Sequence, residues 1–143
     1  MTRIDFYVLP EQGRGSRELL ACRLTEKAYD RGHRIFIHTA TREQAETLDS
    51  LLWTYRDESF LPHALCTQEL ADDSPIQIGH SEEPRGNCDV LINLSLEVPA
   101  FFSRFERVAE LVGSGNDERQ RAREAFRFYK DRGYPLDTHQ LKS

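Results

Sequence analysis

The sequence predicts a single α/β domain over residues 1–143, with a mainly parallel sheet flanked by helices on both faces. Short apolar runs of strand length alternate along the chain with segments of helical periodicity, and a β-α-β-α order favours parallel strands covered by helices. A chain of 143 residues is long enough to bury one core without disulfides or metals. Its composition, 38% hydrophobic and 30% charged, is typical of a soluble globular protein.

The first strand and the first helix are joined by a short turn. Residues Ile4–Leu9 form an apolar run that predicts a buried strand. Ser16 can cap a helix that extends to Gly32, since glycine suits the left-handed conformation just after a helix end. The turn, residues 11–16, lies where a phosphate loop would lie, but it lacks both G-x-x-x-x-G-K-[ST] and G-x-G-x-x-G. We therefore expect no nucleotide site there.

A second strand and helix follow directly. His33–His38 is rich in β-branched and aromatic residues, which predicts a strand. Thr41 and Gln44 match a capping box at the start of the next helix. The apolar stripe of that helix has four members at helical spacing, namely Ala45, Leu48, Leu52 and Tyr55.

The middle of the chain adds two strands and one ambiguous segment. Pro75–Gly79 predicts a short strand and Asp89–Ser95 a central one. Apolar residues between positions 101 and 112 recur at helical spacing, although a sheet of this size would accommodate a further strand at Arg107–Val112. The prediction for this segment is a short helix that leads into a strand.

The C-terminal segment, residues 111–140, contains an amphipathic helix with an unusual edge. Its basic residues lie within about 80° of each other at 100° per residue: Arg119, Arg123, Arg127 and Lys130. The neighbouring apolar stripe comprises Ala122, Ala125, Phe126 and Tyr129. Asp117–Arg132 carries a charge of +2, whereas the whole chain carries −5. This pattern fits either a solvated helix face or a binding strip for an acidic peptide with a hydrophobic end.

Charge, cysteines and hydropathy exclude several classes of function. A net charge of −5 disfavours general binding of nucleic acid, so any contact with DNA would be local or made through a partner. Three widely spaced cysteines, Cys22, Cys66 and Cys88, indicate reduced thiols and a cytoplasmic protein. The sequence has no apolar run of the roughly 20 residues needed to span a membrane, and we expect neither a membrane segment nor a signal peptide.

The residues that could carry catalysis or bind a metal do not form a recognisable set. His63 and Cys66 resemble a Cys–His pair only by proximity, since no third orienting residue can be identified. The spacing of cysteines and histidines does not match a four-ligand zinc site. The sequence therefore predicts no catalytic residue, no metal site and no cofactor.

A second notable segment closes the helix that begins near Thr41. Trp53, the only tryptophan, lies about 100° away from the inward stripe, and Phe60 follows in an apolar loop that ends at Pro62. An aromatic turned away from the core indicates a protein–protein contact. The alternative is that the loop folds back and covers Trp53.

The two segments together resemble one known family. Residues 51–63, LLWTYRDESFLPH, and residues 122–134, AREAFRFYKDRGY, are similar to motifs of the chi subunit of the bacterial DNA polymerase III holoenzyme. The predicted strands match the family in order along the whole chain. The resemblance implies a single α/β domain similar to mononucleotide-binding folds, a strand at Arg107–Val112 and no catalytic activity. It also implies two partners, the psi subunit of the clamp-loader assembly and the acidic C-terminal tail of single-stranded DNA-binding protein.

The resemblance assigns residues to both partners. It places the tail-binding site at Arg123, Arg119, Phe126, Arg127 and Val112. A guanidinium can bind the free carboxylate of the terminal Phe of the tail through two hydrogen bonds, and the Phe ring needs an apolar neighbour. Phe126 stands where a tyrosine occurs in some relatives, which removes a hydroxyl group. Gly113–Asn116 predicts a flexible lead-in that loosens the pocket floor. The resemblance places the psi-binding surface at Trp53 and Phe60.

The sequence therefore favours a noncatalytic adaptor that contacts DNA only indirectly. One alternative is a small enzyme or nucleotide-binding protein of similar α/β fold, which the missing phosphate loop and catalytic set disfavour. Another is direct DNA binding, which the acidic net charge disfavours.

Overall fold

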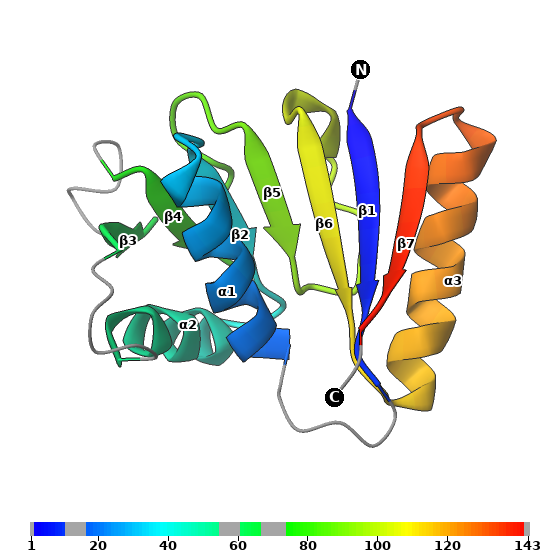
Figure 1. Ribbon diagram of the computed structural model, residues 1–143, viewed down its shortest axis with the longest axis horizontal. Coiled ribbons are helices and arrows are strands. Elements are labelled where there is room, and N and C mark those ends of the chain that lie inside the picture. Colours follow the sequence, from blue (N-terminus) through cyan, green and yellow to red (C-terminus); the bar gives the residue numbers. More distant parts are fainter. Residues whose placement is uncertain (1, 11–16, 55–60, 67–73, 142–143) are drawn as a thin grey trace.

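The computed structural model describes residues 2–10, 17–54, 61–66 and 74–141. Its centre is a seven-stranded sheet in the order β3-β4-β2-β5-β6-β1-β7, and every strand pairing is parallel (Figure 1). The strands are β1 (Arg3–Val8), β2 (Ile35–His38), β3 (His63–Leu65), β4 (Ile76–Gly79), β5 (Val90–Asn93), β6 (Arg107–Val112) and β7 (Leu136–Gln140). The predicted α/β class is confirmed.

Helices cover both faces of the sheet, as predicted. They are α1 (Arg17–Asp30), α2 (Arg42–Thr54) and α3 (Asn116–Asp131), with a 3-10 helix η2 (Phe102–Arg104) before β6. Helices α1 and α2 pack over the β2–β5 half of one face, whereas α3 runs alongside β7 on the other (Figure 1). The core under α1 and α2 is mainly aliphatic and includes Ile35, Ile37, Ile76, Ile78 and Ile92. The core next to α3 is largely aromatic and includes Phe6, Phe36, Phe102, Phe105 and Tyr129.

The predicted helix ends match the structure closely. Gly32 adopts a φ of 87°, the left-handed conformation that a residue with a Cβ rarely adopts. At the start of α2, the Gln44 N–H donates to Thr41 Oγ1 at 3.1 Å. The Gln44 side chain accepts from the N–H of Ala40 at 3.0 Å, one residue before the position that a standard capping box uses. Ser16 and Tyr55 of the predicted helices lie outside the described residues.

The ambiguous segment is a short helix followed by a strand, as predicted. Its helix is the single 3-10 turn η2, and its strand is β6. The apolar residues at helical spacing are Phe101, Phe105, Val108 and Val112. The two phenylalanines flank η2, whereas the two valines lie on one face of β6, and all four pack into the core next to α3. In β6 the side chains then alternate between the two faces of the sheet, so both faces receive apolar residues.

Two edge strands, β3 and β7, were not predicted. Strand β7 is polar, and four of its five residues are exposed, so it carries no apolar run. It pairs with β1 along Leu136–Gln140 and thereby lies beside α3. Strand β3 has only three residues. Both strands exist because a neighbouring strand offers hydrogen bonds, which local sequence does not reveal.

Two further expectations concern thiols and membranes. Cys22, Cys66 and Cys88 are thiols in the structure, in agreement with the expected reduced state, and all three are buried. Of the helices in the described ranges, none combines the length and the apolar character that crossing a bilayer requires.

Candidate functional site

Helix α3 and the carboxyl ends of three strands enclose a pocket of about 220 Å³. The strands are β1, β6 and β7, at the β7 edge of the sheet. The lining comprises Phe6, Val8, Val112, Arg119, Ala122, Arg123, Phe126, Thr138 and Gln140. Four of the five residues expected to bind a peptide tail are therefore brought together here. The fifth, Arg127, is exposed one turn further along α3 and does not line the pocket.

The inner part of the pocket is apolar. The rings of Phe6 and Phe126 lie 5.5 Å apart at an interplanar angle of 57°, a tilted aromatic contact. Val112 is buried behind them, with 4% of its surface exposed. Burying a Phe-sized side chain against such a surface contributes about 1.5–3 kcal/mol. The inner part is thus suited to one apolar side chain.

The rim of the pocket is cationic. Arg119 and Arg123 lie one turn apart on α3, and Arg123 is exposed. The contact from Arg123 Nη1 to Gln120 Oε1 is 3.5 Å, at the outer limit of a hydrogen bond. Little energy therefore opposes a turn of this guanidinium toward an anion. A carboxylate with an attached apolar side chain is the ligand that combines both halves of the pocket.

The lead-in to α3 is tied down, which corrects the expectation of a loosened pocket floor. The Glu118 side chain folds back over the glycines, where it accepts from the Gly115 N–H at 3.3 Å and pairs with Arg17 Nε at 2.8 Å. A Cβ on Gly113 would collide with the Glu118 carboxylate. The glycines are therefore required to admit this carboxylate, which links the start of α3 to α1.

A buried hydrogen-bond network holds the middle of α3 against the sheet. Tyr129 is fully buried, and its hydroxyl donates to Glu110 Oε2 over 2.6 Å. The Asn93 amide donates to both Glu110 oxygens at 3.0 and 3.1 Å. Burial raises the pKa of Glu110 to about 7, against the opposing effect of these two donors. Burial and the Glu110 carboxyl also raise the pKa of Tyr129. This network ties α3 to β5 and β6.

Trp53 lies at the other end of the sheet. It is 50% exposed on α2, near the β3 edge, and its ring packs on His63 with centroids 4.3 Å apart (Figure 1). Phe60, expected on the same surface, lies outside the described residues. Leu61 and Pro62, the rest of the loop that would cover Trp53 in the alternative, are described, and Leu61 is buried. The structure therefore brings Trp53 together with His63, and nothing can be said of Phe60.

His63 does not act as the partner of a cysteine nucleophile. Its Nδ1 lies 2.5 Å from the Leu61 carbonyl oxygen, and its Nε2 lies 2.9 Å from the Asp49 carbonyl oxygen. Both ring nitrogens thus face backbone acceptors instead of the Cys66 thiol. The His63 ring packs against the ring of Trp53 at an interplanar angle of 47°.

The residues that sequence reasoning missed at the pocket beside α3 are Phe6, Val8, Thr138 and Gln140. Phe6 and Val8 belong to the predicted first strand, but their face of that strand is set only by the packing of α3. Thr138 and Gln140 belong to β7, which was not predicted. The sequence of β1 does not indicate on which of its two faces the later helix α3 packs.

Comparison with known proteins is consistent over the whole chain. A family model described as DNA polymerase III chi subunit, HolC, matches residues 1–137. The chain is 45% identical to DNA polymerase III subunit chi of Pseudomonas aeruginosa, over 99% of this chain and 98% of that protein. It is 29% identical to DNA polymerase III subunit chi of Escherichia coli, over 96% of this chain and 97% of that protein.

A solved structure shares the fold at low identity. T4 UvsW matches 98% of this chain with a TM-score of 0.71 and 10% identity, and the match covers 41% of UvsW. This similarity shows an α/β architecture and is evidence for the fold alone.

Proposed function

Since the chain belongs to the DNA polymerase III chi subunit family, and is therefore an accessory subunit of that replication assembly, we propose that it acts as a noncatalytic adaptor. One surface binds the acidic C-terminal tail of single-stranded DNA-binding protein, and the other binds the psi subunit of the clamp-loader assembly. The protein then reaches DNA only through these partners, and it works in the cytoplasm.

The pocket beside α3 is the observation that carries the proposed tail contact. It combines an apolar interior around Phe6 and Phe126 with the guanidinium groups of Arg119 and Arg123 at its rim. The tail ends in a Phe that bears a free carboxylate, so one residue supplies both the ring and the anion. Arg127, outside the pocket, is suited to the more distal acidic residues of the tail.

The exposed tryptophan supports the proposed psi contact. Exposed aromatic residues dominate many protein interfaces, and Trp53 is half exposed while one part of its ring packs on His63. Its position near the β3 edge leaves the tail pocket, near the β7 edge, accessible to a second partner (Figure 1).

Titration of the protein with three ligands tests this function against its alternatives. We expect saturable binding of an acidic peptide that ends in Pro-Phe, and no measurable binding of single-stranded DNA at physiological salt. Isothermal titration calorimetry measures both. A titration with nucleotide is the third experiment and tests the alternative of a nucleotide-binding protein of similar fold. If the protein bound single-stranded DNA but not the peptide, the adaptor hypothesis would be wrong and direct DNA binding would take its place.

The terminal Phe of the peptide should contribute more than any single distal Asp. Only the Phe is buried in the proposed pocket, whereas distal carboxylates lie near exposed cations that are screened over about 10 Å at 0.1 M ionic strength. Deletion of the Phe should therefore abolish most of the affinity, and raised salt should weaken the remainder. Calorimetry with truncated peptides at two salt concentrations measures both effects. Equal losses for Phe and Asp deletions would indicate a diffuse basic patch.

The two surfaces should be separable by mutation. Trp53→Ala, and likewise Phe60→Ala, should impair capture of psi while tail-peptide affinity stays within about twofold, because distant sites without shared partners behave additively. Co-purification with psi, run beside a peptide titration on the same proteins, measures both. Leu19→Ala is the matched control, because Leu19 is also an exposed apolar residue but lies on a different helix, α1. This variant should retain both psi capture and peptide binding. Loss of both activities in folded Trp53→Ala would mean one shared surface.

A further inference from the structure

One half of the sheet face that bears α1 and α2 has no helix over it among the described residues. Helix α1 packs against β2, β5 and β6. The sheet then continues through β1 to β7 (Figure 1). Parallel sheets are usually covered on both faces, so an uncovered half is unusual. The side chains on this half are polar, and they include Asp5, Tyr7 and His139.

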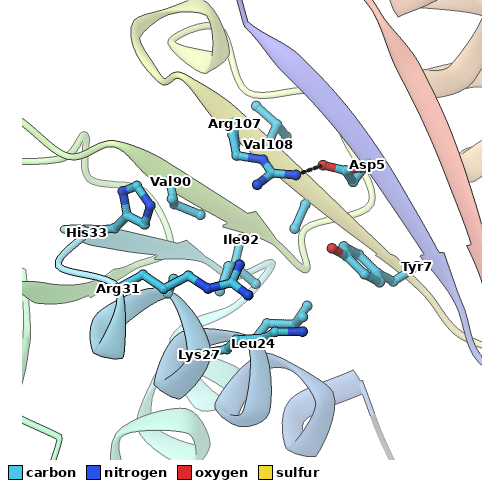
Figure 2. Close-up of a pocket in the computed structure, with 12 residues that line it drawn as sticks. Asp5, Tyr7, Leu24, Lys27, Arg31, His33, Val90, Ile92, Arg107 and Val108 are labelled. Carbon is cyan, nitrogen blue, oxygen red and sulfur yellow. Dashed lines mark hydrogen bonds and ion pairs between the residues drawn. The ribbon is translucent and has the colours of Figure 1, made fainter.

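A pocket of about 260 Å³ lies where α1 meets this uncovered half, on the face opposite the tail pocket. Its floor is apolar and is formed by residues of α1, β5 and β6, namely Leu24, Ala28, Val90, Ile92, Val108 and Ala109. Its rim carries the polar residues Asp5, Tyr7, Lys27, Arg31, His33 and Arg107. Figure 2 shows the guanidinium groups of Arg31 and Arg107 and the hydroxyl of Tyr7 pointing toward the same central space. Donors from three elements thus surround one cavity.

Two cations of α1, Arg23 and Lys27, and Arg31 just after its last residue form a row of like charge. Arg23, Lys27 and Arg31 follow each other at intervals of four residues, so like charges are neighbours along the helix surface. Within the described ranges, Lys27 and Arg31 form no ion pair with a carboxylate. A cation near the C-terminal end of a helix interacts favourably with the helix dipole, and this effect alone can explain why Lys27 and Arg31 are basic. It does not account for Arg107, which faces them from β6.

The remaining polar groups of the rim are compatible with an anion. Arg107 Nη2 lies 3.2 Å from Asp5 Oδ2, so the one carboxylate of the pocket is already neutralised, and His139 Nε2 lies 3.0 Å from Asp5 Oδ1. His33 Nδ1 lies 3.4 Å from Asp89 at the outer end. Burial, aided by the Asp5 charge, raises the pKa of Tyr7, so its phenol stays a neutral hydroxyl that can donate.

We propose that this pocket binds a small phosphate monoester, with the phosphate between Lys27, Arg31 and Arg107 and the organic part on the apolar floor. Three cationic donors, with Lys27 and Arg31 on the α1 side and Arg107 on the β6 side, match the three terminal oxygens of a phosphate better than the two oxygens of a carboxylate. The cavity is too small for a folded partner, and the net charge of −5 opposes a long polyanion such as nucleic acid. The proposal is independent of the adaptor function, because it uses another face and other residues.

The test uses phenyl phosphate, inorganic phosphate and benzoate as probes of the intact protein. Amide chemical shifts measured by NMR should move around Leu24–Arg31 and Arg107–Ala109 and saturate with phenyl phosphate. Inorganic phosphate should bind more weakly because it lacks the apolar part, and benzoate most weakly because it lacks the third oxygen and the second charge. Adenosine monophosphate and glucose 6-phosphate then distinguish a nucleotide from a sugar phosphate as the natural type of ligand.

Charge-removing variants complete the experiment. Lys27→Gln and Arg31→Gln should each weaken phenyl phosphate about tenfold or more, as expected for loss of a charge-assisted hydrogen bond. Arg23→Gln is the matched control, since it removes the same charge from the same row but does not line the pocket, and it should change the affinity less than twofold. All three side chains are exposed, so the variants should fold. Equal weakening in all three, benzoate binding as tight as phenyl phosphate, or shifts confined to α3 would each overturn the proposal.

Discussion

Arg123→Ala is expected to weaken binding of the tail peptide by about 1.5–3 kcal/mol, which is roughly tenfold to more than a hundredfold in affinity. Its guanidinium lies at the rim of the pocket whose interior holds Phe6 and Phe126, where a carboxylate attached to a buried ring would be partly desolvated. The fold should not change, because Arg123 is exposed and makes only one weak side-chain contact. Isothermal titration calorimetry with the peptide measures the loss.

Arg121→Ala is the matched control for this experiment. Arg121 lies on the same helix and carries the same charge, but it points to the other side, near Glu97 and Asp117. Both ion pairs are long and exposed, so their loss should cost little stability. If Arg121→Ala lowered the affinity for the peptide as much as Arg123→Ala does, net charge alone would explain the binding. Wild-type affinity in Arg123→Ala would remove the residue from the proposed site.

The second large effect is on stability and concerns the buried Glu110. Its folded-state pKa is raised from 4.5 to about 7, chiefly by burial, so between these values the folded protein binds more protons at this group than the unfolded chain does. The contribution of Glu110 to stability is therefore fully present below about pH 4.5 and is lost as the pH rises through about 7. At 1.36 kcal/mol per pKa unit, the loss amounts to about 3 kcal/mol.

Glu110→Gln isolates this effect, since glutamine cannot ionise and retains a carbonyl oxygen that accepts from Tyr129. The stability of the wild type relative to this variant should fall as the pH rises from about 4.5 to above 7, within the range set by the pKa shift. Chemical denaturation at a series of pH values measures it. Tyr129→Phe, which removes the 2.6 Å donor but keeps the ring, should raise the pKa of Glu110 further and move the loss to higher pH. Parallel pH curves for wild type and Glu110→Gln would show that Glu110 does not ionise in this range.

The predictable part of the fold consists of elements whose own side chains fill the core. The aliphatic run of β2 and the apolar stripes of α2 and α3 lie within single segments, and their periods are visible without knowledge of the rest of the chain. The short turn η2 and the strand β6 were predicted together, although the helical spacing of Phe101, Phe105, Val108 and Val112 by itself favoured a longer helix. Periodicity failed only at the sheet edges, where β3 and β7 need no apolar residues because one side of each strand has no neighbouring strand.

The α3 side of the proposed tail site could be predicted from the sequence, whereas the strand side could not. The basic strip and the apolar stripe of α3 follow from helical spacing, and resemblance to a family added Val112 from a different segment. The partners across the pocket did not follow, because Phe6, Val8, Thr138 and Gln140 approach α3 only through long-range pairing of β1, β6 and β7. The closed lead-in was also missed, since Arg17 lies about a hundred residues before the Glu118 with which it pairs.

The sequence by itself determined the α/β class, the location of α3 along the chain and the residues on the basic and apolar sides of that helix. These features depend on the spacing of residues that are close in the chain. The tertiary structure alone decided which face of β1 supports α3, where β7 runs, and that Lys27, Arg31 and Arg107 surround a second pocket. It also decided the pKa of Glu110, because the cost of charging a carboxyl depends on the atoms that exclude water from it. Those atoms come from β5, β6 and α3, which meet only when the sheet is assembled.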